Sequence, residues 1–312
     1  MSAPPRLPIA LAADLRLGEP PPALHPTVWM GRALGRARDR HAAARPSPAA
    51  ALLAGAAALG AGVVAAGSAG LLAERALARV PHRRARAALG GLLLKPAFSV
   101  RALLAAGRAV ERALRRGDLP AARRLLAWHL VSRDTARLTA SEVAGAAIES
   151  LAENLGDGVV APLLAHAAGG LAGAYAYRLV NTADAMLGYR TPELEWFGKA
   201  AARADDALNL APARLAAALV ALAAPAAGGS ARRAFAAALA DAARTPSPNA
   251  GWPMAAMAGA LGVRLDKRDG GAPLYVLHAA GRAPGVGDLA RARRIVGAAA
   301  GLAAALAMLA TR

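Results

Sequence analysis

Three carboxylates and an amide crowd one short stretch of a chain that is otherwise poor in acids. Residues Glu149 to Ala161 read Glu-Ser-Leu-Ala-Glu-Asn-Leu-Gly-Asp-Gly-Val-Val-Ala, with acids at Glu149, Glu153 and Asp157 and an amide at Asn154. Mg²⁺ takes hard oxygen ligands, usually one or two carboxylates together with phosphate oxygens. The stretch therefore indicates a metal or nucleotide site; a solvated acidic helix face is the alternative.

A second set of polar side chains lies near the end of an uncharged run. Arg178 offers a cation, Asn181 an amide and Asp184 a carboxylate. Polar side chains at membrane depth are costly and indicate a site by default. The alternative is an interfacial Arg that reaches the lipid head groups, with incidental polar neighbours. A weaker signal of the same kind follows at Asp205, Asp206 and Asn209.

A third candidate is the stretch Ser247-Pro-Asn-Ala-Gly-Trp-Pro253. Two prolines and a glycine within seven residues cannot form a helix interior, so we expect a fixed loop. Asn249 offers an amide and tolerates unusual backbone angles, and Trp252 offers a flat surface for a ring system. The alternative is a turn between helices that carries a buried Trp.

One helix could position the first group. The spacing predicts a helix from Ser141 to Leu155, with Ser141 as its N-cap. At about 100° per residue, Glu142, Glu149 and Glu153 fall within roughly 40° of one another on one face. Such like charges repel, and a bound Mg²⁺ would offset the repulsion. The helix is expected to end near Gly156, leaving Asp157 in a Gly-Asp-Gly turn that a ligand can approach closely.

Long uncharged runs predict membrane spans. The mean hydropathy is +0.33 and 56% of the residues are hydrophobic, although much of this is Ala. The run Ala49 to Ala73 holds 25 residues, and a helix needs about 20 to cross a bilayer. It is bracketed by Arg45 and Glu74. Weaker candidates of 19, 17 and 17 residues are Val159 to Tyr177, Leu215 to Ala231 and Ile295 to Thr311.

The expected fold is all-α, because Ala and Leu dominate, Gly and Pro punctuate, and no stretch alternates convincingly as a strand. We predict a polytopic helical membrane protein forming a single domain over residues 1–312. Residues 119–214 form its polar, acid-rich middle region, which bears the candidate site. Between Asp134 and Asp206 lie ten of the chain's 20 acids, against five bases. A soluble all-α protein with buried apolar helices is the alternative.

The net charge of +18 is compatible with nucleic acid, anionic lipid or an anionic substrate. Arg residues crowd beside the hydrophobic runs, which is typical of contact with lipid head groups. Readers of nucleic acid usually interleave aromatics or carry a recognisable motif, and the sequence has neither. The lipid bilayer is therefore the expected partner and nucleic acid is not. The absence of Cys excludes disulfides and thiolate sites.

Several unusual strings, in order along nearly the whole chain, resemble the CobD/CbiB family of cobalamin biosynthesis, the adenosylcobinamide-phosphate synthases. They are Asp14-Leu-Arg-Leu-Gly-Glu-Pro with His25-Pro26, Val131-Ser-Arg-Asp-Thr135, Glu149 to Pro162, Tyr177-Arg178 with Asn181-Thr182 and Asp184, Gly188-Tyr-Arg190, Phe197-Gly198 with Ala202-Arg203 and Asp205-Asp206, and Ser247 to Pro253 with Ala258-Gly259-Ala260-Leu261.

The resemblance implies a multi-pass enzyme of the cell inner (plasma) membrane. Such an enzyme is an amide ligase that joins the free propionate of adenosylcobyric acid to (R)-1-amino-2-propanol or its O-phosphate, giving adenosylcobinamide (phosphate). ATP and Mg²⁺ are implied as substrates or cofactors, with no tightly bound cofactor. Association with other late cobalamin-pathway enzymes is also implied. A non-catalytic membrane scaffold for those enzymes, or a membrane transporter, would be the alternative functions.

On this resemblance each candidate residue receives a role. Glu149, Glu153 and Asp157 would hold Mg²⁺ and, with Arg178 and Asp184, act in catalysis. Binding of the nucleotide, the corrinoid or the amine would fall to Asn154, Asn181, Arg203, Asp205, Asp206, Asn249 and Trp252. The chain departs from the family pattern at Met254, where an acid is usual, and at Thr245, where a His is common.

Overall fold

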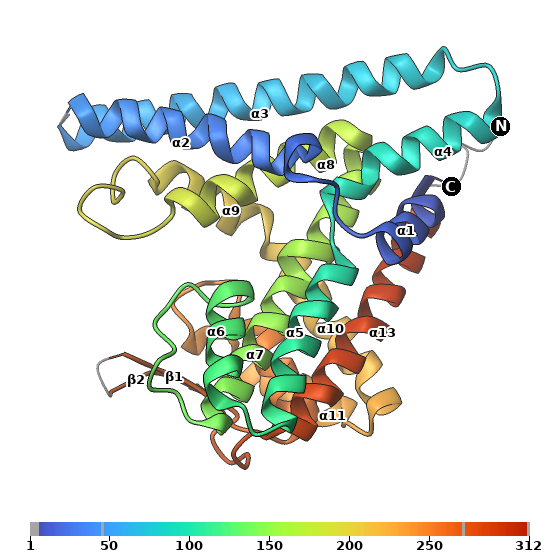
Figure 1. Cartoon of the computed structure of the whole chain (residues 1–312). Coiled ribbons are helices and arrows are strands. Elements are labelled where there is room, and N and C mark those ends of the chain that lie inside the picture. The colour runs from blue at the N-terminus through green and yellow to red at the C-terminus, as the bar shows by residue number, and fades with distance from the viewer. Residues whose placement is uncertain (1–5, 45–46, 270–271, 311–312) are drawn as a thin grey trace. The chain divides into compact units, whose positions relative to one another are not determined.

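The computed structural model describes residues 6–44, 47–269 and 272–310. These residues form thirteen α-helices, several short turns of 3-10 or π helix (η) and one two-stranded hairpin (Figure 1). The all-α expectation is confirmed. Two residues named above as flanking or ending apolar runs, Arg45 and Thr311, lie outside the described residues.

Contacts between Cα atoms divide the chain into two compact units. Unit 1 comprises Met1–Ser99, Ala161–Asn209 and Leu306–Arg312, and unit 2 comprises Val100–Val160 and Leu210–Ala305. The unit boundaries cut through the polar middle region, residues 119–214. The single domain over residues 1–312 stays a prediction, and each unit is described by itself.

Unit 1 is built around the long helix α3, with α2, α8 and α9 packed against it (Figure 1). Ser47 caps α3 and a proline opens it, and Gly70 brings its backbone directly against that of Ala172 in α8. Small residues allow such close helix packing. The elements are α1 (Arg6–Leu17), η1 (Pro22–Leu24), α2 (Pro26–Ala44), α3 (Pro48–Ala78), α4 (Arg83–Leu94), η2 (Lys95–Ala97), α8 (Ala161–Leu187) and α9 (Lys199–Leu208).

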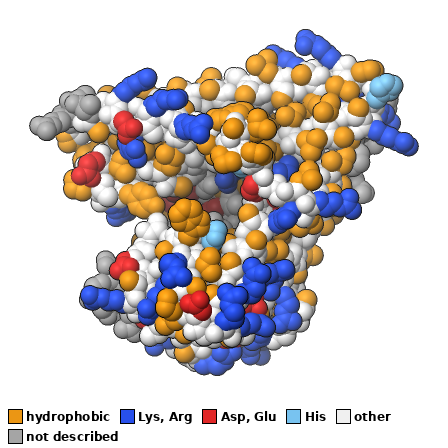
Figure 2. Space-filling view, viewed as in Figure 1, with side chains coloured by type: hydrophobic (Ala, Val, Ile, Leu, Met, Phe, Trp, Pro, Cys, Tyr) orange, Lys and Arg blue, Asp and Glu red, His pale blue; other side chains and the backbone are white. Residues whose placement is uncertain are grey.

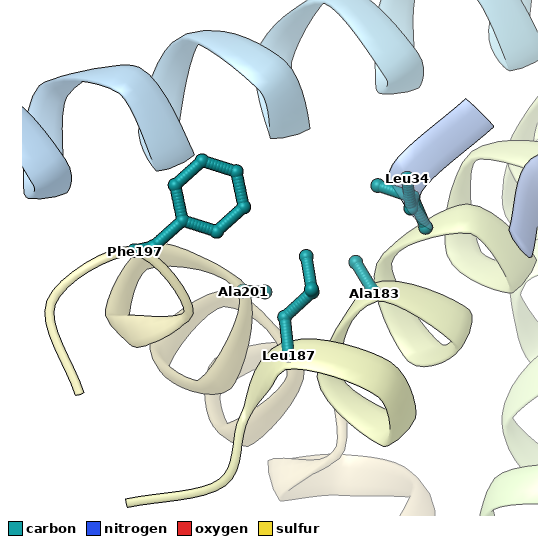
Figure 3. Close-up of a cluster of buried hydrophobic side chains, with 5 residues drawn as sticks. All are labelled: Leu34, Ala183, Leu187, Phe197 and Ala201. Atoms are coloured by element: carbon teal, nitrogen blue, oxygen red, sulfur yellow. The ribbon is translucent and has the colours of Figure 1, made fainter. Parts of the chain in front are cut away.

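A hydrophobic cluster fixes the end of α8 against α9 in unit 1. Figure 3 shows its five buried side chains, contributed by α2, α8, the turn after α8, and α9. Phe197 comes from the turn and also stacks on the His41 ring, with 4.5 Å between ring centroids. The turn between the two helices is therefore anchored from both ends. The cluster consists of Leu34, Ala183, Leu187, Phe197 and Ala201.

Unit 2 surrounds the short helix α12, which packs against α7, α10 and α11. Ten of the eleven residues of α12 are buried, as expected for a helix that is apolar on every side. The elements are α5 (Val100–Arg115), α6 (Leu119–His129), α7 (Ala140–Leu155), η3 (Gly156–Val160), α10 (Leu210–Ala223), η4 (Ala224–Ala227), α11 (Ala231–Asp241), η5 (Ala242–Arg244), α12 (Gly251–Leu261), β1 (Leu265–Asp269), β2 (Ala272–Leu277) and α13 (Val286–Ala310), whose last residues belong to unit 1.

The expectation of no strand is wrong, because β1 pairs antiparallel with β2. The two strands are short, and β1 reads Leu-Asp-Lys-Arg-Asp, which hides the alternation of a half-buried strand. A pair of glycines between two short runs is nevertheless typical of a hairpin, and β2 contains Tyr and Val, which favour strands. Gly270 and Gly271 themselves lie outside the described residues.

Four helical stretches within the described ranges are long and apolar enough to cross a membrane, or up to five if one bent helix pair counts as a span. The first two predicted runs lie within these stretches. The run Leu215 to Ala231 extends four residues past its stretch, and the described part of the run from Ile295 lies within the last one. Only 17% of the apolar window of α3 is buried, so its side chains are available to lipid, and Figure 2 shows hydrophobic side chains along its surface. These helices support a polytopic membrane protein. The stretches are Pro48–Ala78, Ala140–Leu187, Leu210–Ala227 and Val286–Ala310.

Candidate functional site

The start of α7 uses one of the predicted acids for capping. Thr139, not Ser141, is the N-cap, and its side chain accepts a hydrogen bond from the backbone N–H of Glu142. The Glu142 carboxylate in return accepts the backbone N–H of Thr139 at 2.8 Å. Ser141 instead donates its hydroxyl to the carbonyl of Pro284 at 2.8 Å. The predicted Ser141 cap is therefore wrong, and Glu142 is engaged in this capping box.

Glu149 is the most unusual acid of α7, because it is 6% exposed and only partly hydrogen-bonded. The hydroxyl of Tyr275 in β2 acts electrostatically on this carboxylate. Its Oε1 atom has no hydrogen-bond partner among the described residues. Positive charges on Arg133 and Lys267 and the negative charge of Glu153 act on the same carboxylate. Glu149 thus presents a buried oxygen that the fold does not use.

Tyr275 is a site residue that the sequence reasoning missed. Burial, with the negative charges of Glu149 and Glu153, raises the pKa of Tyr275 above its usual range, so its hydroxyl remains a proton donor. The hydroxyl oxygen also lies 3.9 Å from the Sδ atom of Met254, the position that departs from the family pattern. The sequence signals for this residue were the glycine pair before β2 and the strand-favouring Tyr and Val within it, since they predict the hairpin that places Tyr275.

The acidic stretch does not end in a simple turn as predicted. Residues Gly156–Val160 continue as a π-helical turn, a feature found frequently at functional sites. The half-buried Asp157 lies within this turn. Asn154 is exposed, roughly 100° around the helix from Glu153, and its amide donates to the carbonyl of Ser150 at 2.9 Å. The acids of the stripe outside the capping box are Glu149 and Glu153, with Asp157 beyond them.

These residues can be compared with what a magnesium ion requires. Within the described part of the chain there is no group of three or more His, Asp or Glu side chains that could hold a metal. Mg²⁺ needs fewer, because one or two carboxylates with phosphate oxygens and water suffice. The unused oxygen of Glu149, with Glu153 one helical turn away, fits that requirement. The assignment of Glu149, Glu153 and Asp157 to a metal stays a prediction.

The Asn249 and Trp252 region is a loop that runs directly into α12. The Ser247 hydroxyl accepts the backbone N–H groups of Asn249 and Ala250, each at 3.2 Å. The Thr245 hydroxyl donates to the carbonyl of Ser247 at 2.9 Å, so Thr245 holds the loop. The expected loop from Ser247 to Pro253 is three residues too long, because α12 begins at Gly251. Pro253 lies in the first turn of this helix, where proline is tolerated.

Trp252 lies in the first turn of α12, and a cationic side chain covers one face of its ring. The Arg214 guanidinium lies over this ring, 4.7 Å from its centroid. Asn249, just before the helix, is buried at 5% exposure. The two residues are thus held in fixed positions in unit 2, and their binding roles stay predictions.

In unit 1, a hydrogen-bonded network joins α8 to α9 through several of the predicted residues. Arg178 donates to Asn181 Oδ1 at 3.0 Å, and Asn181 donates to Asp205 Oδ1 at 3.3 Å. Asn209 donates to Asp205 Oδ2 at 2.9 Å and accepts the Tyr177 hydroxyl at 2.9 Å. Burial raises the pKa of Asp205, although these two amide hydrogen bonds oppose the shift. Both oxygens of Asp205 are therefore occupied by the fold.

The remaining predicted residues of unit 1 lie around the turn between α8 and α9. The half-buried Asp184 lies against the backbone of Gly188. Arg203 and Asp206 line a pocket of about 290 Å³ at this turn. Burial raises the pKa of Asp206, although the positive charges of Arg203 and Arg190 oppose the shift. The full lining is Gly188, Tyr189, Arg190, Leu194, Glu195, Gly198, Lys199, Ala202, Arg203 and Asp206.

The predicted residues thus fall into two groups, one in each unit. The group in unit 2 contains Glu149, Glu153, Asn154, Asp157, Asn249 and Trp252. The group in unit 1 contains Arg178, Asn181, Asp184, Arg203, Asp205 and Asp206.

Comparison with known proteins gives one consistent result. The family model described as CobD/Cbib protein matches residues 7–297. A "Cobalamin biosynthesis protein CobD" of Geobacter metallireducens is 47% identical over 198 residues, covering 64% of this chain and 61% of that protein. A "Probable cobalamin biosynthesis protein CobD" of Methanothermobacter thermautotrophicus is 39% identical over 259 residues, covering 83% and 82%. The protein of the same description from Methanothrix thermoacetophila is 36% identical over 318 residues, covering 96% and 94%. No solved structure matches.

Proposed function

The chain belongs to the CobD/CbiB family of cobalamin biosynthesis proteins, and we propose that it is an ATP-dependent amide ligase of the cell inner membrane. It joins a propionate carboxylate of adenosylcobyric acid to the amine of (R)-1-amino-2-propanol or its O-phosphate. The observation that carries the proposal is the unused, buried Oε1 atom of Glu149 among cationic and acidic side chains.

The reaction requires activation of the corrinoid carboxylate, because a carboxylate does not condense with an amine at neutral pH. In the proposed first step an oxygen of the corrinoid carboxylate attacks the γ-phosphorus of ATP. The bond from this phosphorus to the oxygen that bridges it to the β-phosphate breaks. ADP departs, and the corrinoid now carries an acyl phosphate. The neutral amine then attacks the acyl carbon, the carbon–oxygen bond to phosphate breaks, and the amine nitrogen loses a proton. The products are the amide, ADP and inorganic phosphate.

The residues of unit 2 offer the charges that phosphoryl transfer needs. Glu149, Glu153 and Asp157 would hold Mg²⁺, which when bound supplies positive charge against the phosphate oxygens. The hydroxyl of Tyr275, which acts on the Glu149 carboxylate, would help to orient it. Arg133 and Lys267, whose charges act on Glu149, would attract phosphate groups to the same place. Catalysis of this kind depends mainly on positioning and electrostatics.

The proposal is tested with the purified full chain in detergent, supplied with adenosylcobyric acid, Mg²⁺-ATP and either form of the amine. We expect a corrinoid product heavier by one amine residue, with one ADP released per amide, detected by mass spectrometry. A folded protein that binds the corrinoid but forms no amide with either amine would contradict the ligase and favour a membrane scaffold. Product formation without nucleotide consumption would contradict the activation step.

A further inference from the structure

The pocket of unit 1 is flanked by closely packed residues. Its lining begins at Gly188, directly after the buried Leu187, and continues at Gly198, directly after the buried Phe197; both buried residues belong to the cluster in Figure 3. A Cβ atom at Gly198 would collide with the carbonyl oxygen of Leu187, so only glycine allows the turn to close on the end of α8. The fold therefore forms this hollow before any ligand arrives.

Three cations and two acids line the pocket, and only one of the cations is paired. Lys199 contacts Glu195 at 2.7 Å and lies 4.3 Å from the centroid of the Trp196 ring. Neither Arg190 nor Arg203, by contrast, has a hydrogen bond or ion pair with any other described residue. Two exposed guanidinium groups thus border one small pocket with their donors unused.

These two guanidinium groups indicate a phosphate. The fork of an Arg side chain matches phosphate oxygens in two parallel hydrogen bonds, and two such groups complement a dianion. The pocket also contains Asp206, on which the charges of both arginines act. A simple anion would gain nothing from this carboxylate, whereas a ligand with a cationic group beside its phosphate would.

The size of the pocket limits the ligand further. Its volume of about 290 Å³ lies at the lower end of the range for small-molecule sites, roughly 300–1,000 Å³. A corrinoid is far larger, and a complete nucleoside triphosphate would leave most of its charge outside. A ligand of a few heavy atoms with both charges close together is the best match.

We propose that this pocket binds a small zwitterion that carries a phosphate monoester and a primary ammonium group, with Arg190 and Arg203 on the phosphate and Asp206 on the ammonium. The inference rests on the proposed function, in which (R)-1-amino-2-propanol O-phosphate is one form of the amine substrate. It adds a location in the fold and the three side chains that would hold this form.

Equilibrium binding to the full chain in detergent, by calorimetry without ATP or corrinoid, tests the proposal. The probes are (R)-1-amino-2-propanol O-phosphate, propyl phosphate, which lacks the amine, and inorganic phosphate. We expect the phosphoamine to bind most tightly and Arg203→Ala to weaken both organic phosphates roughly tenfold or more. Asp206→Asn should weaken the phosphoamine alone. Arg79→Ala removes an exposed charge at the C-cap of α3, away from the lining, and should change nothing.

Several outcomes would overturn the proposal. Equal affinity for all three probes would reduce the pocket to a general anion site, and an equal loss in Arg79→Ala would make the effect one of net charge. No binding of the phosphoamine by a protein that still makes amide from it would reject the pocket while the ligase stands. Binding with the expected pattern in a protein that forms no amide would support the pocket and reject the ligase.

Discussion

Two buried carboxylates, one in each unit, differ in how completely the fold uses them. Asp205 in unit 1 is 8% exposed, and each of its oxygens accepts a hydrogen bond from an asparagine. Glu149 in unit 2 is 6% exposed, and one of its oxygens has no hydrogen-bond partner within the described chain. Burying an unsatisfied polar atom is costly. The hydrogen bonds of Asp205 explain why its carboxylate can be buried, whereas the burial of the Glu149 carboxylate is explained by a bound ligand.

The largest expected effect is on turnover in Glu149→Gln. The substitution preserves the shape of the side chain but removes its charge, so folding should survive. Amide formation at saturating Mg²⁺-ATP should fall roughly 100-fold or more, as when an electrostatic group at a reacting centre is removed. Initial rates of product formation measure this.

Glu142→Gln, on the same helix, is the matched control, because that acid serves the capping box. Its turnover should stay near that of the wild type, with at most about 1 kcal/mol lost in unfolding free energy. If Glu149→Gln retains turnover at saturating Mg²⁺-ATP, the metal assignment fails.

Asp205→Ala should act on stability instead. It leaves the amide groups of Asn181 and Asn209 without their acceptor between α8 and α9, so the unfolding free energy should fall by roughly 2–4 kcal/mol. Turnover per folded molecule should be retained. Thermal unfolding in detergent, with activity normalised to the folded fraction, separates the two effects. If Asp205→Ala kept its stability but lost turnover, Asp205 would be a functional carboxylate and not a structural one.

Tyr275→Phe should give a smaller loss, because it removes only the hydroxyl that acts on the Glu149 carboxylate. We expect turnover to fall about tenfold, as for other residues that contact a metal-binding side chain but not the metal itself. The apparent affinity for Mg²⁺ should weaken while the KM for the amine is unchanged, a pattern that a general loss of packing would not produce. Equal changes in both parameters would indicate a structural role only.

The smallest effect concerns a third carboxylate, Glu19 in unit 1, which is paired with two basic side chains. Burial would raise its pKa, but the His25 ring and the Lys95 ammonium, 2.9 and 2.7 Å from its Oε2 atom, help to lower it to about 2. The folded chain therefore keeps Glu19 ionised where the unfolded chain, with a value near 4.5, binds a proton.

The contribution of Glu19 should consequently be complete above about pH 4.5 and should disappear as the pH falls toward 2. Unfolding midpoints measured across this window should decline less steeply in Glu19→Gln than in the wild type. Parallel curves would show that this ion pair does not couple to folding.

The helices could be predicted because stretches rich in Ala and Leu are separated by Gly and Pro. The membrane spans could be predicted because some of these stretches are long and uncharged. Loop boundaries were close for the same reason, since the prolines near Asn249 exclude a helix interior. The choice between two possible caps was harder to predict, because both Thr and Ser are common N-cap residues. In the structure Thr139 forms the capping box with Glu142, and Ser141 donates to the carbonyl of Pro284 instead. Because Thr139 is the N-cap, Glu142 occupies the position that completes the capping box.

Long-range placement was the part that spacing could not supply. The Glu149 stripe was visible from helical periodicity, but its contact with Tyr275 joins segments far apart in the chain. Equally, no spacing rule could show that Asn181 and Asn209 would satisfy both oxygens of Asp205. The sequence could mark which acids were candidates, but the hydrogen bonds were needed to separate a structural acid from an open one.

The contrast between Glu149 and Asp205 is tested most directly by metal binding. Mn²⁺ can replace Mg²⁺ and be titrated by electron paramagnetic resonance into the ATP-bound full chain, its Glu149→Gln variant and its Asp205→Asn variant. The account predicts at least a roughly tenfold weaker affinity in Glu149→Gln and an unchanged affinity in folded Asp205→Asn. Unchanged affinity in Glu149→Gln, or an equal loss in both variants, would contradict it.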